Sequence, residues 1–116
     1  MIVGNRTSGK QIRCLTAFSI LPQIRGLMFR PNQVNILFDF REEAIHPIHS
    51  LFVFFPFYAI YISEGKKVTE KALVGPFRLL HRNAGPARYL LEAGLADGAL
   101  FSVGDEVDFD AGLEDK

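Results

Sequence analysis

The chain of 116 residues contains no tryptophan and a single cysteine, Cys14. One thiol cannot form an internal disulfide, so the sequence favours a reducing compartment and we expect a cytoplasmic protein. A long apolar stretch is missing too. The polar N-terminal residues 1–11 differ from the apolar centre of a signal peptide. The run from Leu51 to Ile62 is interrupted by Pro56 and falls short of the roughly 20 residues that span a bilayer, so we expect no membrane partner.

The chain also has no net charge at pH 7, because 13 basic residues balance 13 acidic ones. The two signs are separated along the chain: no acidic residue precedes Asp39, and acidic residues predominate after Tyr89. We expect the two ends to neutralise each other across the folded domain. A nucleic-acid backbone is bound mainly through an excess of basic groups, so zero net charge argues against a nucleic-acid partner.

The one candidate motif for nucleotide binding is incomplete. Residues Gly4–Lys10 show the glycine, four residues, glycine and lysine of a phosphate-binding loop, but Gln11 stands where the motif requires serine or threonine. A strand-like segment follows instead of a helix. We interpret the segment as a frayed N-terminus, and the sequence predicts no cofactor.

Histidines offer an incomplete metal site. His46 and His49 are three residues apart, but Pro47 between them argues against a helix that would place both on one face. Zinc requires three or four ligands. The remaining candidates, His81 and Cys14, are distant along the chain, and no spacing brings them together. We therefore expect no metal.

Acidic residues near the C-terminus do not complete a site either. Glu106, Asp108 and Asp110 resemble the start of a calcium loop, but Ala111 replaces the required glycine. Alternation of these residues with Val107 and Phe109 is typical of an edge strand with one solvated face. No nucleophile elbow is present, so the sequence favours a non-enzymatic protein.

Phenylalanine, by contrast, is abundant, with 11 residues, and aromatic side chains favour sheets. Short strand-like segments separated by turn signals predict antiparallel pairing instead of repeated βαβ units. The expected strands are Gln11–Phe18, Val34–Phe40, Leu51–Ile62 (bent at Pro56), Lys67–Leu73, Ala87–Ala93 and Val107–Phe109.

Helices are expected to be short. Ser19 can cap a helix near residues 19–26, which Gly26 would end, and Asp97–Phe101 suggests one helical turn. Residues Arg41–Pro47 read as a polar connection. The sequence thus predicts a single domain over residues 1–116, with an ordered core at about 11–110 and a polar tail at 111–116. Its expected class is mainly β, a compact antiparallel sandwich or barrel-like domain.

Gly26–Arg30 matches in full the glycine-leucine-methionine-phenylalanine-arginine block of an uncharacterised family, domain-of-unknown-function family one hundred ninety-two. Asn35–Phe40 and Ile48–Pro56 resemble its next two blocks, the second being closest to archaeal members. Gly104 and Asp105 resemble the glycine-aspartate turn near the end of the family. The resemblance covers about residues 12–109 in one order. It implies a β-sandwich-like fold and brings no established activity, substrate or cofactor.

Two positions depart from the family pattern, Gln23 in place of an arginine and Tyr58 in place of an aspartate. If these positions form a shared site, this chain has changed it. The candidate ligand-binding residues near the matching blocks are Arg25, Arg30, His49 and Tyr58. We expect a non-catalytic module that binds a small molecule or a protein partner. The alternatives are a structural or self-associating protein and, less favoured, an enzyme or metal-binding protein that uses His49.

Overall fold

The computed structural model describes residues 1–17, 34–45, 55–76 and 83–109. Their secondary structure consists of strands and one short helix, listed here in chain order: β1 (Ile2–Asn5), β2 (Gln11–Arg13), β3 (Leu15–Ala17), β4 (Ile36–Ala44), β5 (Phe57–Ile62), β6 (Val68–Val74), β7 (Ala87–Ala93), α2 (Leu95–Gly98) and β8 (Val107–Phe109). The helix expected near residues 19–26 lies outside the described residues, as do the expected tail and the first part of the Leu51–Ile62 strand.

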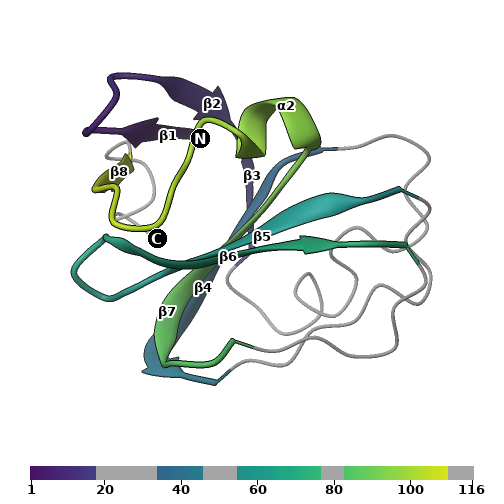
Figure 1. Cartoon of the computed structure of the whole chain (residues 1–116). Coiled ribbons are helices and arrows are strands. Elements are labelled where there is room, and N and C mark those ends of the chain that lie inside the picture. Colours follow the sequence, from purple (N-terminus) through teal and green to yellow (C-terminus); the bar gives the residue numbers. More distant parts are fainter. Residues whose placement is uncertain (18–33, 46–54, 77–82, 110–116) are drawn as a thin grey trace.

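Two sheets build the domain, a small one in the order β2-β1-β8 and a larger one in the order β3-β4-β7-β5-β6. The small sheet lies on one side of the larger sheet (Figure 1). The described pairs are antiparallel, except that β3 pairs with β4 in parallel. The predicted mainly-β sandwich is therefore confirmed, with one parallel pair that the antiparallel prediction did not include.

Residues that alternate along the strands of the large sheet contribute their side chains to two separate apolar layers. Ile60 and Leu91 pack in the layer between the two sheets, together with Val3 and Phe109 of the small sheet. Side chains from the same strands that point the other way form the second layer, whose members include Phe57 and Leu90. Both faces of β5 and β7 are buried, which is why β5 has no charged residue and β7 has charged residues only at Arg88 and Glu92.

The N-terminal segment belongs to the core, so its interpretation as a frayed end is wrong. β1 is the central strand of the small sheet, pairing with β2 on one side and with β8 on the other. Val3 is completely buried within the layer between the sheets. A four-residue strand carries too little apolar pattern to be seen in sequence, and its burial depends on β8, about a hundred residues away.

Val3→Ala is expected to lower the free energy of unfolding by about 2 kcal/mol, because it removes two buried methyl groups and leaves a cavity. Lys10→Ala, at an exposed position of the following turn, is the matched control and should change stability by less than about 0.5 kcal/mol. Urea unfolding measures both. Equal, negligible effects would mean that β1 is not part of the packed core.

The expected strand at residues 11–18 is two strands in different sheets. β2 belongs to the small sheet and β3 to the large one, and the chain passes between them at Cys14. The Cys14 N–H donates to Met1 O at 2.9 Å, and the next N–H, of Leu15, donates to Asn35 O at 2.8 Å. This change of partner explains why the alternation of polar and apolar residues slips near Leu15.

Other boundaries were predicted with mixed success. β7 and β8 begin and end at the predicted residues, and β5 starts directly after Pro56. The polar connection predicted from Arg41 is wrong as far as Ala44, because β4 continues through a register shift between Asp39 and Ala44. Its polar residues lie on an exposed strand end. The helical turn predicted at Asp97–Phe101 occurs slightly earlier, as α2.

Candidate functional site

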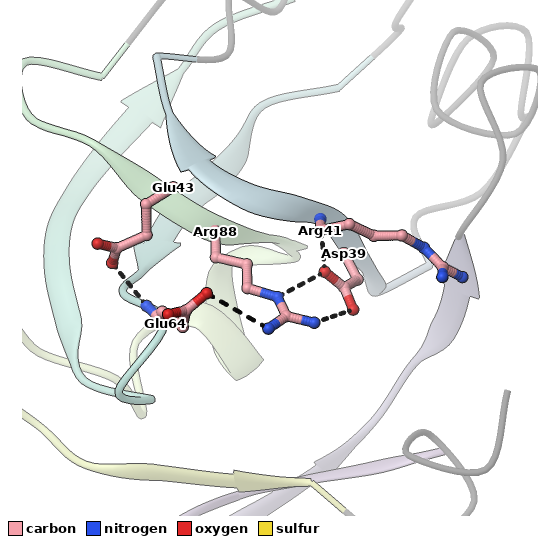
Figure 2. Close-up of polar contacts among 5 residues, drawn as sticks. All are labelled: Asp39, Arg41, Glu43, Glu64 and Arg88. Atoms are coloured by element: carbon pink, nitrogen blue, oxygen red, sulfur yellow. Dashed lines mark hydrogen bonds and ion pairs between the residues drawn. The ribbon is translucent and has the colours of Figure 1, made fainter.

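An ion-pair network joins the end of the large sheet to the turn between β5 and β6 (Figure 2). The Arg88 guanidinium on β7 holds Asp39 on β4 with two hydrogen bonds, from Nε at 3.0 Å and from NH2 at 3.2 Å. NH1 of Arg88 lies 3.5 Å from Oε1 of Glu64 in the turn. The Glu64 N–H in turn donates to Oε2 of Glu43 at 2.7 Å.

The same network fixes an unusual stretch of β4. The Arg41 backbone has φ of 67°, which is rare outside glycine, and its N–H donates to Oδ1 of Asp39 at 2.8 Å. The Arg41 side chain extends away from the Asp39–Arg88 pair (Figure 2). Each charge of this pair already has an opposite charge beside it. We therefore assign the network to holding β4, β7 and the turn together.

A second polar group has no such partner. Glu92 lies in β7 between β4 and β5, opposite Ile36 on one side and Ala59 on the other, and is only 6% exposed. Among the described residues, no hydrogen bond or ion pair reaches its carboxyl group. Burial raises the pKa of Glu92 to about 8 from its ordinary 4.5, because an ionised carboxylate is poorly solvated there. The protein therefore holds this carboxyl group mostly protonated at neutral pH.

Two other acidic side chains share the face of Glu92. Tyr61 on β5 pairs with Glu70 on β6, and Tyr61 is two residues from Ala59, the partner of Glu92. Burial raises the pKa of the Tyr61 phenol, and the charges of Glu70 and Glu92 raise it further. Ala59 and Ala72 stand beside Glu92 in the same row across the sheet. These five residues are called the Glu92 face.

The alanines of the Glu92 face leave the buried carboxyl group without a neighbouring hydrogen-bond partner. An alanine adds only one carbon above the sheet, so neither Ala59 nor Ala72 offers a hydrogen-bond partner to Glu92. Burying an unpartnered polar group costs free energy. A ligand that brought the missing partner would recover that free energy.

Tyr58, the one sequence-predicted site residue among those described, lies on the other face of the large sheet. Its ring packs against the small sheet's layer and directly under α2, where Gly98 allows the close approach. Nζ of Lys71 lies 4.3 Å from the centroid of the Tyr58 ring and donates to Phe101 O at 2.8 Å. These contacts hold β5, β6 and α2 together. Arg25, Arg30 and His49 lie outside the described residues.

The segment that resembles a phosphate-binding loop is a tight hairpin between β1 and β2. Oδ1 of Asn5 accepts hydrogen bonds from the N–H groups of Thr7 and Ser8. The N–H groups of the other residues in 5–10 also donate to protein oxygens. No backbone donor of this hairpin is left for a phosphate, and the antiparallel β2 follows it. This geometry differs from that of a phosphate-binding loop, in which a helix follows the glycines.

The sequence-based metal candidates are not brought together in the part of the chain described here. Within it, no three His, Cys, Asp or Glu side chains are close enough to share a metal ion. His46, His49 and His81 are outside the described residues. Cys14 is buried, and burial raises the pKa of its thiol to about 12. Glu106 and Asp108 are exposed on either side of the buried Val107, as an edge strand requires.

The Cys14 thiol is expected to resist alkylation in the native protein. A thiolate is the reactive form, and at pH 8 a thiol with a pKa of about 12 is almost entirely protonated as well as covered. Iodoacetamide should label native protein at least about a hundredfold more slowly than protein unfolded in urea. Mass spectrometry measures the labelled fraction, and comparable rates in both states would contradict the buried position.

Sequence reasoning did not select Glu92. The signal was present, because Tyr89–Ala93 places one glutamate inside an otherwise apolar strand. A charged residue in a strand buried on both faces needs a reason. That reason becomes visible only once β7 is known to be an interior strand with neighbours on both sides.

The fold and these groups define a small two-sheet β domain with a buried carboxyl group on one face of its larger sheet. The family model of DUF192, described as an uncharacterised ACR, matches residues 2–109. The chain belongs to this family, as its blocks of sequence suggested, and the family's function is unknown. The comparison with curated proteins finds no match.

Two solved structures are similar to the chain. A protein of unknown function from Novosphingobium aromaticivorans DSM 12444 has a TM-score of 0.82 at 23% identity, over 93% of this chain and 83% of that one. A putative transcription regulator from Sinorhizobium meliloti 1021 has a TM-score of 0.80 at 21% identity, over 92% of this chain and 90% of that one. At these identities the likeness shows the fold alone. The expected closeness to archaeal members is not borne out, since both structures are bacterial.

Among the described residues, no helix is long and apolar enough to cross a membrane.

Proposed function

We propose that this protein is a non-catalytic module that binds a small molecule on the Glu92 face. The observation that best supports this proposal is that Glu92 is 6% exposed and has no hydrogen-bond partner among the described residues. A carboxyl group kept in that state destabilises the fold, and a leucine of similar size would avoid the cost. A glutamate at this position is understandable if a ligand completes its hydrogen bonds.

The neighbouring groups support binding. Binding sites are typically apolar with a few placed polar groups, and the Glu92 face combines the phenol of Tyr61 and the carboxylate of Glu70 with Ala59 and Ala72. Glu70 is fixed by the Ala84 N–H, which donates to its Oε1 at 2.8 Å. Fixed polar groups lose little conformational entropy when a ligand arrives.

A thermal-shift screen against metabolites tests the proposal. A ligand at a hundred times its dissociation constant stabilises the native state by about 2.7 kcal/mol, which raises the melting temperature measurably. The shift should be abolished by Glu92→Gln and reduced by Tyr61→Phe, each compared with its own ligand-free melting temperature. Asp108→Asn, exposed on β8 in the other sheet, is the matched control and should keep the full shift. Hits that survive Glu92→Gln unchanged would place the site elsewhere.

Arg25, Arg30 and His49 stay predictions from the sequence as ligand-binding residues, and alanine variants in the same screen test them. The proposal also places the protein in the cytoplasm, which its single cysteine favours.

Self-association is the second candidate function. β6 is the outermost described strand of the large sheet, and Leu73 on it is 58% exposed. An exposed strand edge with an apolar side chain can pair with another chain. Light scattering over a range of concentrations tests this candidate. A molecular mass that rises with concentration and falls back in Leu73→Lys would support it, and a constant monomer mass would remove it.

A further inference from the structure

Three adjacent strands contribute acidic groups to the Glu92 face. Glu92 comes from β7, Tyr61 from β5 and Glu70 from β6, and the strands are neighbours in the order β7-β5-β6. Residues paired across neighbouring strands have their side chains about 5 Å apart, and diagonal neighbours are still within reach of long side chains. Among its described residues, β4, on the other side of β7, adds the apolar Ile36, Phe38 and Phe40 to this layer. The Tyr61 phenol is therefore the group between the two acids on this face, a diagonal neighbour of Glu92 and the direct cross-strand partner of Glu70.

The basic residues of these strands are engaged elsewhere. Lys71, the one lysine of β6, points to the opposite face, where its amine contacts Tyr58 and Phe101 O. Arg88, the one basic residue of β7, is paired with Asp39. β5 contains no basic residue. Within β5, β6 and β7, the Glu92 face thus has acceptors of positive charge and no positive charge of its own.

We infer that the ligand of the Glu92 face is a small organic cation with a primary ammonium group. This inference rests on the proposed function and names the class of its ligand. An ammonium group offers three N–H donors and a positive charge, which match carboxylate and phenol oxygens. An anion would be repelled by Glu70, and a neutral alcohol would leave Glu92 protonated and add no charge-assisted hydrogen bond. The described acidic groups do not form a three-ligand metal site, which separates this ligand class from a divalent cation.

Ligand binding has a defined proton balance. In the empty protein Glu92 carries a proton at pH 7, since its pKa is about 8. A bound ammonium favours the carboxylate, so the Glu92 proton leaves to solvent as the ammonium arrives. The ammonium keeps its own proton. Each binding event at pH 7 therefore releases close to one proton.

The test compares four-carbon probes that differ in the head group. Butylamine, 1-butanol and sodium butyrate are titrated into the full chain at matched ionic strength, and binding is followed by calorimetry in two buffers of different ionisation enthalpy. We expect butylamine to bind with release of close to one proton, and the other two probes to bind at least about tenfold more weakly. Glu92→Gln should lose butylamine binding and the proton release. Asp108→Asn should retain both.

The outcomes separate the ligand class from the site. If butanol or butyrate binds as well as butylamine and Glu92→Gln abolishes that binding, the site stands and the cation is overturned. Butylamine binding that is unchanged in Glu92→Gln overturns the placement of the cation on this face. If none of the three probes binds, the ammonium class is overturned, while a different hit of the metabolite screen that depends on Glu92 would still support the site.

Discussion

Glu92→Gln is expected to make the protein more stable in alkaline solution and to remove much of its pH dependence. The carboxyl group has a pKa of about 8 in the folded state and an ordinary value of 4.5 when unfolded. The folded state therefore holds the proton more tightly, and stability is fully present below pH 4.5. Between pH 4.5 and 8 the unfolded state alone loses the proton, so the free energy of unfolding falls as pH rises.

The magnitude follows from the two pKa values. Each unit of pKa difference corresponds to about 1.4 kcal/mol. From below pH 4.5 to pH 8, the wild-type protein should lose about 4 kcal/mol more stability than Glu92→Gln, and above pH 8 the difference should level off. Glutamine has nearly the same shape and no proton to release, so the comparison isolates the charge.

Urea unfolding of both proteins at a series of pH values measures this difference. Other titrating groups are common to both chains and cancel in the comparison. Asp108→Asn, which removes an exposed carboxylate, should follow the wild-type curve closely. Parallel curves for wild type and Glu92→Gln would show that Glu92 is ionised at its ordinary pKa, and the unpartnered carboxyl group could no longer support a ligand site.

Gly98→Ala is expected to destabilise the protein by about 3 kcal/mol, although alanine favours a helix over glycine by about 1 kcal/mol. A Cβ at position 98 would lie 2.5 Å from Cδ2 of Tyr58 and 2.9 Å from its Cβ. Tyr58 cannot easily give way, because its ring lies under the Lys71 amine and its backbone pairs with β6 and β7. α2 or β5 would have to shift. Urea unfolding or thermal melting measures the loss.

A matched variant and a double variant complete this test. Gly85→Ala places a methyl group where no atom lies within 4 Å, so it should change stability by less than about 0.5 kcal/mol. Gly98→Ala combined with Tyr58→Ala should cost little more than Tyr58→Ala alone, because the clash partner has gone. Additive losses would place the cost of Gly98→Ala somewhere other than the Tyr58 contact.

The local sequence pattern was sufficient to predict those strands in which the pattern is strong. Ala87–Ala93 and Val107–Phe109 were predicted at their observed bounds, because an apolar run and a strict alternation are properties of neighbouring residues. Pro56 was predicted as a bend within Leu51–Ile62, and β5 begins directly after it, because proline lacks the N–H that an interior ladder needs. The family was likewise readable from short blocks of sequence. These features require no knowledge of which strand lies beside which.

Local pattern failed where a partner distant in the chain decides the outcome. β1 is a strand because β2 and β8 pair with it, and Cys14 separates two strands because its two sides pair with different sheets. β4 continues past Arg41 because Asp39 accepts the Arg41 N–H and the Arg88 guanidinium. Burial and pairing over long sequence separations are tertiary properties, so no short window contains them.

By itself the sequence determined a β-rich fold with balanced charge and no complete nucleotide, metal or catalytic motif, since composition and short-range patterns carry that information. Tertiary structure alone decided which polar residue became chemically unusual. Tyr58, chosen from a family block, lies under α2 as a packing residue, whereas Glu92 lies in an interior strand between Ile36 and Ala59. A carboxyl group acquires its pKa and its need for a partner from what surrounds it, and only the assembled sheet supplies those surroundings.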